Sequence, residues 1–201
     1  MKDITVTLVG SPRLVRAWST AFADTPVPVT HGDILVTAYG HALVSPANSF
    51  GWMDGGLDAA ISLAYATQGL DITARVQAAI RMEAAGELPV GAALIVPTPE
   101  GPYSHLVVAP TMRTPRPVPW TLHAYLAFRA TLLTVRAWNS AHPDQPVQAL
   151  DCPGLATGIG HMPGRRAARQ MRAAWDQVER DPATTPPLAT LTVQEYRLRH
   201  G

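Results

Sequence analysis

The segment SPANSFGWMDGGLDAA (residues 45–60) decides how the rest of this 201-residue chain is interpreted. It follows an apolar run that predicts a strand, and it leads into a stretch with the periodicity of a helix. Its glycine pair, Gly55 and Gly56, permits the backbone conformations that a tight turn or a close approach to a ligand requires. The segment is therefore either a structural turn between a strand and a helix or a loop that holds a ligand.

The composition is that of a globular protein with a substantial core. Hydrophobic residues make up 47% of the chain and charged residues 15%. The formal net charge of +1 excludes a long-range field that would recruit nucleic acid or an anionic membrane. The chain has one cysteine, Cys152, a first stretch unlike a signal peptide, and no apolar run of the ~18–20 residues that a membrane span needs. These features predict a single cytoplasmic domain over residues 1–201, with no membrane partner.

Strand and helix patterns alternate along the chain, which predicts an α/β fold with a mostly parallel sheet. Residues 1–27 form an N-terminal strand–helix extension, and residues 181–201 an irregular tail with one further strand predicted at Leu188–Val193. The prolines of TMRTPRPVPW (111–120) exclude regular structure there. The predicted strands are 4–10, 27–30, 33–37, 41–47, 93–97, 105–110 and 147–155, and the predicted helices are 11–23, 57–67, 71–82, 122–139 and 165–178.

Two strand-to-helix loops carry glycines, the one around Gly55 and Gly56 and a second, ATGIGHMPG (156–164). In an open α/β sheet, ligands bind at the loops beyond the carboxyl ends of the strands. Free N–H groups ahead of a helix favour an anion, so two adjacent loops of this kind suit a diphosphate. Either loop alone is more often a plain connection, and neither matches the P-loop or the dinucleotide fingerprint. Their joint occurrence, with Asp33 upstream, favours a ligand site.

Four motifs together resemble those of the macrodomain, the ADP-ribose-binding fold. They are HGDI (31–34), ALVSPANS (42–49), DGGLDAAI (54–61) and LATGIGHMP (155–163). The family pattern is G-D-I, then V-N-A-A-N-S, then G-G-G-V-D-x-x-I, then G-T-G-I-x-x-x-P, and the order and spacing match. The resemblance implies a three-layer α/β/α fold with a mixed, mostly parallel sheet, and ADP-ribose as the ligand.

Matched position by position, the resemblance also implies roles for individual residues. Asp33 corresponds to the acid that accepts a hydrogen bond from the adenine amino group. Asn48 corresponds to the asparagine that binds the distal ribose, and Asp58 to the aspartate that assists water attack in MacroD-type hydrolases. The ligand-binding set implied by the motifs is Asp33, Ile34, Ala47, Asn48, Trp52, Gly55, Gly56, Leu57, Thr157, Gly158, Ile159, Gly160 and His161.

The chain departs from the family pattern in the first loop. Asp54 replaces a third glycine, and Trp52 and Met53 make the loop bulkier, so these positions are expected to set substrate preference. Asp54 is the second candidate carboxylate. In the second loop Gly160 and His161 stand where relatives often carry an aromatic residue, and Phe50 or Trp52 is a substitute from the first loop.

Ordinary structural roles compete with these assignments. Asp58 is also placed to cap a helix, and Asn48 to shape a turn. His161 is either an acid–base or ribose contact or a solvated loop histidine. Arg165 and Arg166 are either anion contacts or a solvated helix face, of which the second is the more usual. Residues 111–120 are either a lid or, by default, a surface connection.

The sequence therefore predicts a macrodomain that binds ADP-ribose and hydrolyses ADP-ribosyl groups from modified protein or nucleic acid. Asn48, Asp58 and Asp54 are the candidate catalytic residues, and no metal site or cofactor is expected. A non-catalytic reader of ADP-ribosylated partners is the alternative from another class. A hydrolase of O-acetyl-ADP-ribose or of ADP-ribose phosphate is a third reading.

Overall fold

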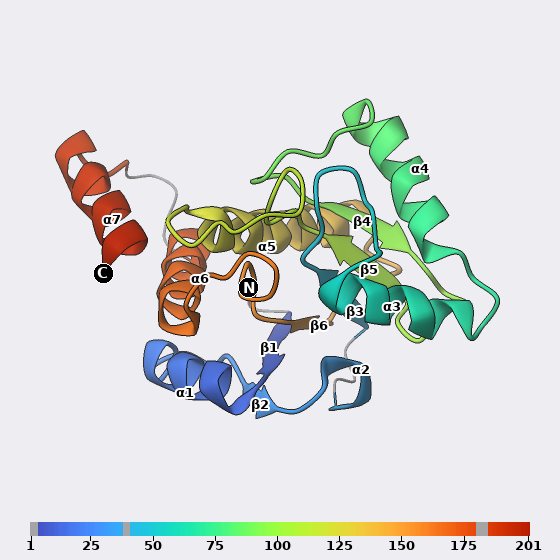
Figure 1. Ribbon diagram of the computed structural model, residues 1–201, viewed down its shortest axis with the longest axis horizontal. Helices are drawn as coiled ribbons and strands as arrows, with labels where there is room; N and C mark the ends of the chain where they lie inside the picture. Colours follow the sequence, from blue (N-terminus) through green and yellow to red (C-terminus); the bar gives the residue numbers. More distant parts are fainter. Residues whose placement is uncertain (1–3, 38–40, 180–184) are drawn as a thin grey trace.

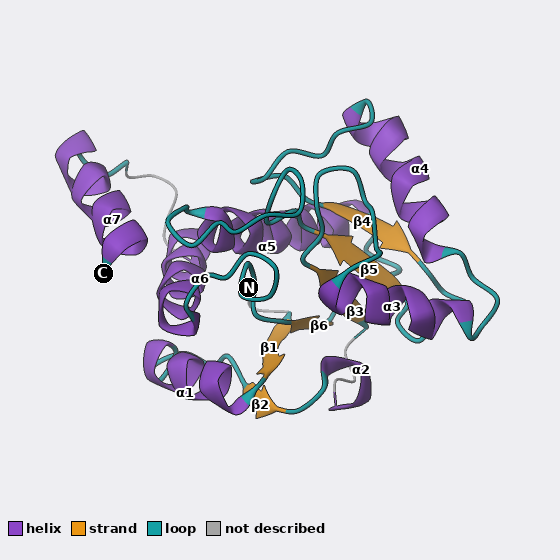
Figure 2. Cartoon of the chain, in the orientation of Figure 1, coloured by secondary structure: helices purple, strands orange, loops and turns teal. Residues whose placement is uncertain are grey.

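A six-stranded sheet with helices on both faces forms the protein (Figures 1 and 2). The computed structural model describes residues 4–37, 41–179 and 185–201. The strand order is β2-β1-β6-β3-β5-β4; all neighbours are parallel except β4 and β5. The predicted α/β/α fold with a mixed, mostly parallel sheet is therefore confirmed. The strands are β1 (Thr5–Gly10), β2 (Val29–His31), β3 (Ala42–Ser45), β4 (Leu94–Pro97), β5 (His105–Val108) and β6 (Ala149–Cys152).

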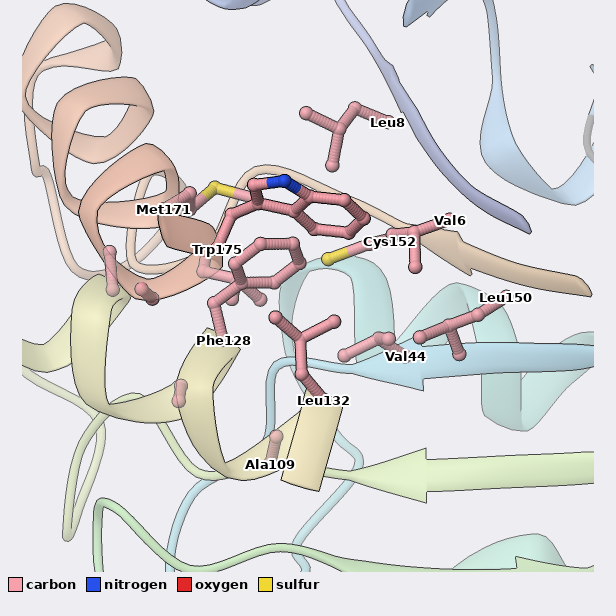
Figure 3. Close-up of a cluster of buried hydrophobic side chains, with 14 of the residues drawn as sticks. Val6, Leu8, Val44, Ala109, Phe128, Leu132, Leu150, Cys152, Met171 and Trp175 are labelled. Carbon is pink, nitrogen blue, oxygen red and sulfur yellow. The ribbon is translucent and has the colours of Figure 1, made fainter. Parts of the chain in front are cut away.

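Two hydrophobic cores lie on opposite faces of the sheet. Successive strand residues alternate between them: Val44 packs with α1, α5 and α6, whereas Leu43 packs with α3 and α4. Figure 3 shows part of the first core, where Phe128 and Trp175 meet Leu8 and Cys152 of the sheet. The helices are α1 (Pro12–Ala21), α2 (Ile34–Thr37), α3 (Gly56–Ala66), α4 (Ile72–Ala84), α5 (His123–Ala141), α6 (Gly164–Glu179) and α7 (Leu188–His200).

The strand–helix unit of residues 1–27 is part of the sheet and not an appendage. From residue 4 onward it is described, and β1 lies between β2 and β6. The register pairs Leu8 with both Val29 of β2 and Cys152 of β6. The first strand of the chain therefore joins its last strand, and the loops that follow both of them open at the same edge.

The strand predicted at residues 33–37 is wrong, because this segment forms the short helix α2. The carboxylate of Asp33 accepts the backbone N–H of Leu35 (2.9 Å), and the carbonyl of Asp33 accepts the N–H groups of Val36 and Thr37. An aspartate that binds its own downstream backbone starts a turn, and this local interaction outweighs the β-propensity of Ile34, Val36 and Thr37. Ile34 is consequently buried against the core of α3 and α4.

The strand predicted at Leu188–Val193 is also wrong, since these residues open the helix α7. The helix starts after Pro187, and none of its residues is buried. It is attached to the rest of the chain by polar contacts: Arg199 donates to the carbonyl of Trp120 (3.0 Å) and Gln170 to that of Leu198 (3.0 Å). The expected irregular tail is therefore helical from residue 188; residues 181–184 lie outside the described ranges.

Candidate active site

The carboxyl ends of β2, β1, β6 and β3 meet at one edge of the sheet, and a cavity of about 330 Å³ opens there. Residues at or just after the ends of these strands line it: Gly10 at the end of β1, Asp33 after β2, Gly154 after β6 and Ala47 after β3. This is the position at which open α/β sheets bind ligands. Both glycine-bearing loops border the cavity, so the structure joins the two sequence features in one site.

Asn48 organises the first loop. Its side-chain oxygen accepts the backbone N–H groups of Phe50 (3.1 Å) and Trp52 (3.3 Å), and its amide nitrogen donates to the carbonyl of Trp52 (2.7 Å). Asn48 therefore shapes the turn, as the sequence analysis considered, and it also lines the cavity. One amide N–H of Asn48 remains without a partner among the described residues, so a hydrogen bond to a ligand is still available.

Asp58 is a buried carboxylate in the cavity wall. It lies in the first turn of α3, is only 8% exposed, and accepts a 2.7 Å hydrogen bond from the hydroxyl of Ser45 at the end of β3. Burial raises its pKa to about 6, and the hydrogen bond from Ser45 opposes this rise. A carboxyl group with a pKa in this range exchanges a proton near neutral pH, which is what acid–base chemistry requires.

Asp58 is not the cap of α3. The residue at the cap position is Gly55, which makes no side-chain cap bond. The carboxylate points instead to Ser45, so the capping role considered for Asp58 is wrong. The charge still lies in the first turn of the helix, where the macrodipole favours it.

The second loop is folded tightly on itself. Ala156 and His161 have positive φ angles of 60° and 51°, and the N–H of Met162 returns to the carbonyl of Ala156 (2.9 Å). The hydroxyl of Thr157 donates to the carbonyl of Gly154 (2.9 Å). These bonds fix the loop with the Thr157–Gly160 segment along the cavity.

The two loops touch across the cavity through Ile159. A Cβ atom built on Gly55 would lie 3.2 Å from Cδ1 of Ile159, and one built on Gly56 3.8 Å from it. Gly56 has a φ angle of +58°, so a side chain there would also strain the backbone. The glycine pair thus lets Ile159, which is 41% exposed, lie over the first loop. The apolar side chain of Ile159 therefore bridges the two loops at the cavity.

Asp33 lies on the other side of the cavity from Asp58. Asp33 follows β2, and Asp58 is bound to Ser45 at the end of β3. Strands β1 and β6 lie between β2 and β3, so the distance from β2 to β3 is three inter-strand spacings, or roughly 14 Å. One carboxylate oxygen of Asp33 binds the N–H of Leu35, and the other has no partner among the described residues. The hydroxyl of Tyr103 holds the neighbouring Ile34 by its carbonyl (2.8 Å). The site is therefore elongated, with a carboxylate on each side.

The structure brings together nearly all the residues expected at the site. Of the fifteen named in the sequence analysis, only His161 does not line the cavity; it is an exposed residue of the second loop. Of the three bulky loop positions, Trp52 (58% exposed) and the exposed Asp54 border the cavity, whereas Met53 is buried in the core. Phe50 does not line the cavity. Its ring lies under the guanidinium of Arg113, whose Cζ is 5.0 Å from the centre of the Phe50 ring.

The proline-rich segment 111–120 was considered either as a lid or, by default, as a surface connection. The proline-rich segment forms one wall, and its Val118 N–H binds the carbonyl of Gly160 (2.8 Å), so the segment holds the second loop. This segment belongs to the site and is not merely a surface connection. The cavity residues that the sequence analysis did not name individually are Val9, Gly10, Leu14, Gly32, Pro46, Thr111, Met112, Pro115, Pro153, Gly154 and Ala156.

Comparison with known proteins agrees with this geometry. The family model of the Macro domain matches residues 44–171, well over half of the chain. The chain belongs to the Macro domain family. This match covers both glycine-bearing loops and Asp58. No curated protein matches this macrodomain closely enough to serve as a relative. None of its helices in the described ranges is long and apolar enough to cross a membrane.

Solved structures share the fold of this macrodomain. The macrodomain of Mycobacterium tuberculosis DarG aligns with a TM-score of 0.56 and 19% identity, over 73% of this chain and 88% of that one. A mutant Oceanobacillus iheyensis macrodomain with ADPR aligns at 0.57 and 18%, over 89% and 81%. Thermosipho africanus DarTG in complex with ADP-ribose aligns at 0.56 and 13%, over 96% and 57%. At these identities the likeness establishes the fold.

Two glycines of the second loop differ in what surrounds them, and this predicts different costs of substitution. A Cβ atom on Gly160 would overlap the carbonyl oxygen of Ala156 and approach Cγ2 of Val118 to 3.0 Å, whereas one on Gly158 meets nothing within 4 Å. We expect Gly160→Ala to lower the free energy of unfolding by about 1–3 kcal/mol. Gly158→Ala is the matched control, expected to change it by less than about 0.5 kcal/mol. Urea denaturation of both variants measures the difference; equal stabilities would contradict the tight fit at Gly160.

Burial of Asp58 predicts that Asp58→Asn stabilises the protein at neutral pH. The folded state holds the Asp58 proton up to about pH 6, while the unfolded state releases it near the ordinary pKa of 3.8. The wild type therefore loses stability as pH rises from about 4 to about 6, by up to roughly 3 kcal/mol, and the asparagine variant does not. The stability gain of Asp58→Asn should be absent near pH 3.5 and fully developed at pH 8.

Urea denaturation across that pH range measures the gain, and Asp54→Asn is the control. Asp54 is exposed, so its replacement is expected to change the free energy of unfolding by less than about 0.5 kcal/mol. A destabilised Asp58→Asn at pH 8 would show that the buried carboxylate is not a cost to the fold.

Proposed function

We propose that this macrodomain binds ADP-ribose in the cavity and hydrolyses ADP-ribosyl groups from modified protein or nucleic acid. The observation that carries the proposal is the elongated cavity between Asp33 and Asp58, bordered by two glycine-bearing loops that meet at the side chain of Ile159. A ligand that suits it has a polar group at one end, a diphosphate in the middle and a reactive sugar at the other end. The solved neighbours with ADPR and ADP-ribose support the same choice.

The order of the strands gives the order of the ligand groups. The free oxygen of Asp33, after β2, would accept the adenine amino group, with buried Ile34 against the ring. The Thr157–Gly160 loop, after β6, would offer N–H groups to the diphosphate. Asn48 and the Gly55–Gly56 pair, after β3, would then surround the distal ribose. Each part of the ligand would thus contact the loop that follows the nearest strand.

Asp58 is the proposed general base. In its charged form it would orient and deprotonate the water that attacks the anomeric carbon, and it would stabilise the positive charge that develops on the sugar. Its burial holds the proton until about pH 6, so the carboxylate is charged but remains basic at neutral pH. Asp54, exposed at the cavity border, is the second candidate for this role. Asn48 would position the ribose while it maintains the loop.

A reader function is the alternative, and one observation favours it. The side chains of Asn48 and Asp58 are engaged by Trp52 and Ser45, which gives each a structural reason for its place. A reader would bind ADP-ribosylated partners without releasing the sugar. Removal of the Asp58 charge would then leave binding unchanged and abolish no reaction.

The adenine assignment predicts a change of base preference in Asp33→Asn. The asparagine oxygen can still accept the N–H of Leu35, but its outer group becomes a donor that cannot accept the adenine amino group. We expect the affinity for ADP-ribose to fall about tenfold or more. Inosine diphosphate ribose, which presents a carbonyl at that position, should regain affinity in the variant. Calorimetric titration measures both.

Asp144→Asn is the control for this titration, since Asp144 is exposed and precedes β6, at the opposite edge of the sheet. An unchanged preference in Asp33→Asn would remove Asp33 from the adenine site. If the wild type releases no heat with ADP-ribose at millimolar concentration and shows no thermal shift, the binding proposal itself fails.

The catalytic assignment predicts that hydrolysis depends on the charge of Asp58. We expect Asp58→Asn to lower kcat/KM by at least about 100-fold while it keeps the affinity for ADP-ribose. The wild-type rate should rise as the pH passes about 6 and then level, because the base acts in its charged form. Release of ADP-ribose from serine, acidic side-chain, arginine, nucleobase and terminal-phosphate linkages measures the activity and identifies the linkage.

Asp54→Asn is the matched variant here, and it separates the two candidate carboxylates. If Asp54→Asn loses the activity and Asp58→Asn keeps it, the assigned roles are reversed. If the wild type releases ADP-ribose from no linkage and still binds it, the protein is a reader.

A further inference from the structure

We propose that a groove between α1 and α6, outside the cavity, binds the phosphate backbone of a single nucleic-acid strand. The groove has a volume of about 970 Å³. Four arginines line it, Arg13 and Arg16 from α1 and Arg165 and Arg169 from α6. No Asp or Glu is among the described residues that line it. The inference goes beyond the proposed function, because it concerns a second site and does not need ADP-ribose.

The arginines are paired by helical spacing. Arg13 and Arg16 are three residues apart and Arg165 and Arg169 four, which places each pair on one face of its helix, roughly 5–6 Å apart at Cβ. Arg13, Arg16 and Arg165 are exposed, and Arg169 is half-buried and donates to the carbonyl of Gly201. Two rows of guanidinium groups thus border one groove, an arrangement that fits consecutive phosphates of a strand.

No acidic side chain of the described ranges neutralises these arginines, and only Arg169 is engaged, by the carbonyl of Gly201. Helix α1 contains no acid, and the acids of α6, Asp176 and Glu179, lie in its last turns. Asp176 and Asp24 are both bound to Arg172, at the far end of the helix pair. The positive charge therefore remains at the end where the arginines lie.

Both helices also begin at this end. A Cβ atom built on Gly164, the first residue of α6, would lie 3.1 Å from Cδ2 of Leu14 in the first turn of α1. The positive ends of two helix dipoles therefore add to the four guanidinium charges. Arg165 was expected to lie on a solvated face, and it does, but that face is one wall of the groove. Arg166 differs: it is buried beside Trp120, 4.2 Å from the ring centre.

The lining favours a nucleic-acid strand over an acidic protein. Its apolar residues are small, Val15, Ala17, Ala21 and Pro163, and it offers no deep apolar pocket for the anchor that protein interfaces usually need. It contains no aromatic side chain, so bases would not stack within it. The contacts available are to phosphates, and we therefore expect binding without sequence preference.

The groove shares a wall with the cavity. Leu14 lines the cavity, while its neighbours Arg13 and Val15 line the groove. The second glycine-bearing loop likewise runs from Thr157 in the cavity to Pro163 in the groove. A strand held by the arginines would pass beside the cavity. If the cavity acts as proposed, this favours nucleic acid over protein as the carrier of the ADP-ribosyl group.

Fluorescence anisotropy with a labelled single-stranded DNA of mixed sequence tests the proposal. We expect the logarithm of the association constant to fall with the logarithm of salt concentration with a slope of about −3, since each neutralised phosphate contributes about −0.7. The double variant Arg13→Gln, Arg16→Gln should bind about tenfold more weakly at physiological salt, with a slope of about −1.5. Arg165→Gln should lose about fourfold.

Arg81→Gln is the matched control, because Arg81 is an exposed helix residue on α4, on the other face of the sheet. The proposal is overturned if the wild type does not bind the strand, if the double variant binds as the wild type does, or if Arg81→Gln loses as much affinity as Arg165→Gln. It is also overturned if polyglutamate displaces the strand at equal charge concentration, which would indicate a site for acidic protein.

The double variant should bind ADP-ribose with unchanged affinity in calorimetry, because neither arginine lines the cavity. A failed DNA titration with intact ADP-ribose binding thus rejects the groove alone. Failed ADP-ribose binding with an intact DNA titration rejects the cavity assignment alone.

Discussion

The site depends on the parallel pairing of β6 between β1 and β3. Thr5–Leu8 pair with Ala149–Cys152 on one side of β6, and Ala42 and Leu43 pair with Leu150 and Asp151 on the other. More than a hundred residues separate β1 from β6, and only this register places the loop after β6 between Asp33 and the first loop. The strand order therefore determines which loop lies in the middle of the cavity. Without β6 the two carboxylates would border an open gap.

Asp58 shows the conflict between stability and a reactive site. A carboxylate in a buried wall loses hydration, and one hydrogen bond from Ser45 offsets only part of that loss. The residue would be better placed for stability on the surface, as Asp54 is. A buried acid that makes neither an ion pair nor a helix cap among the described residues is difficult to explain as a structural element. Under the proposed function, this cost is that of holding a general base in the cavity wall.

The sequence identified the residues whose type and position together have few explanations. Asn48 and Asp58 follow a buried strand at motif spacing, and Gly55 and Gly56 precede a helix, so their place at a strand end could be predicted. Leu14 could not, because it reaches the cavity only when α1 packs against the sheet, and the sequence alone left residues 111–120 between a lid and a surface connection. The two wrong strands have local causes. Asp33 starts a turn through its own side chain, and α7 is held by polar contacts that no periodicity reveals.

The two candidate sites differ in positive charge: arginines line the groove and not the cavity. No Arg or Lys is among the described residues that line the cavity, where the proposed anion contacts are backbone N–H groups of the loops. Backbone dipoles in a narrow space are little affected by salt, and they select by geometry. The arginines lie outside, in a groove open to solvent, where binding weakens with salt and is tolerant of sequence. A net charge of only +1 is compatible with an anion-binding groove, because four arginines lie together there, whereas Arg75, Arg113 and Arg172 elsewhere are paired with acids.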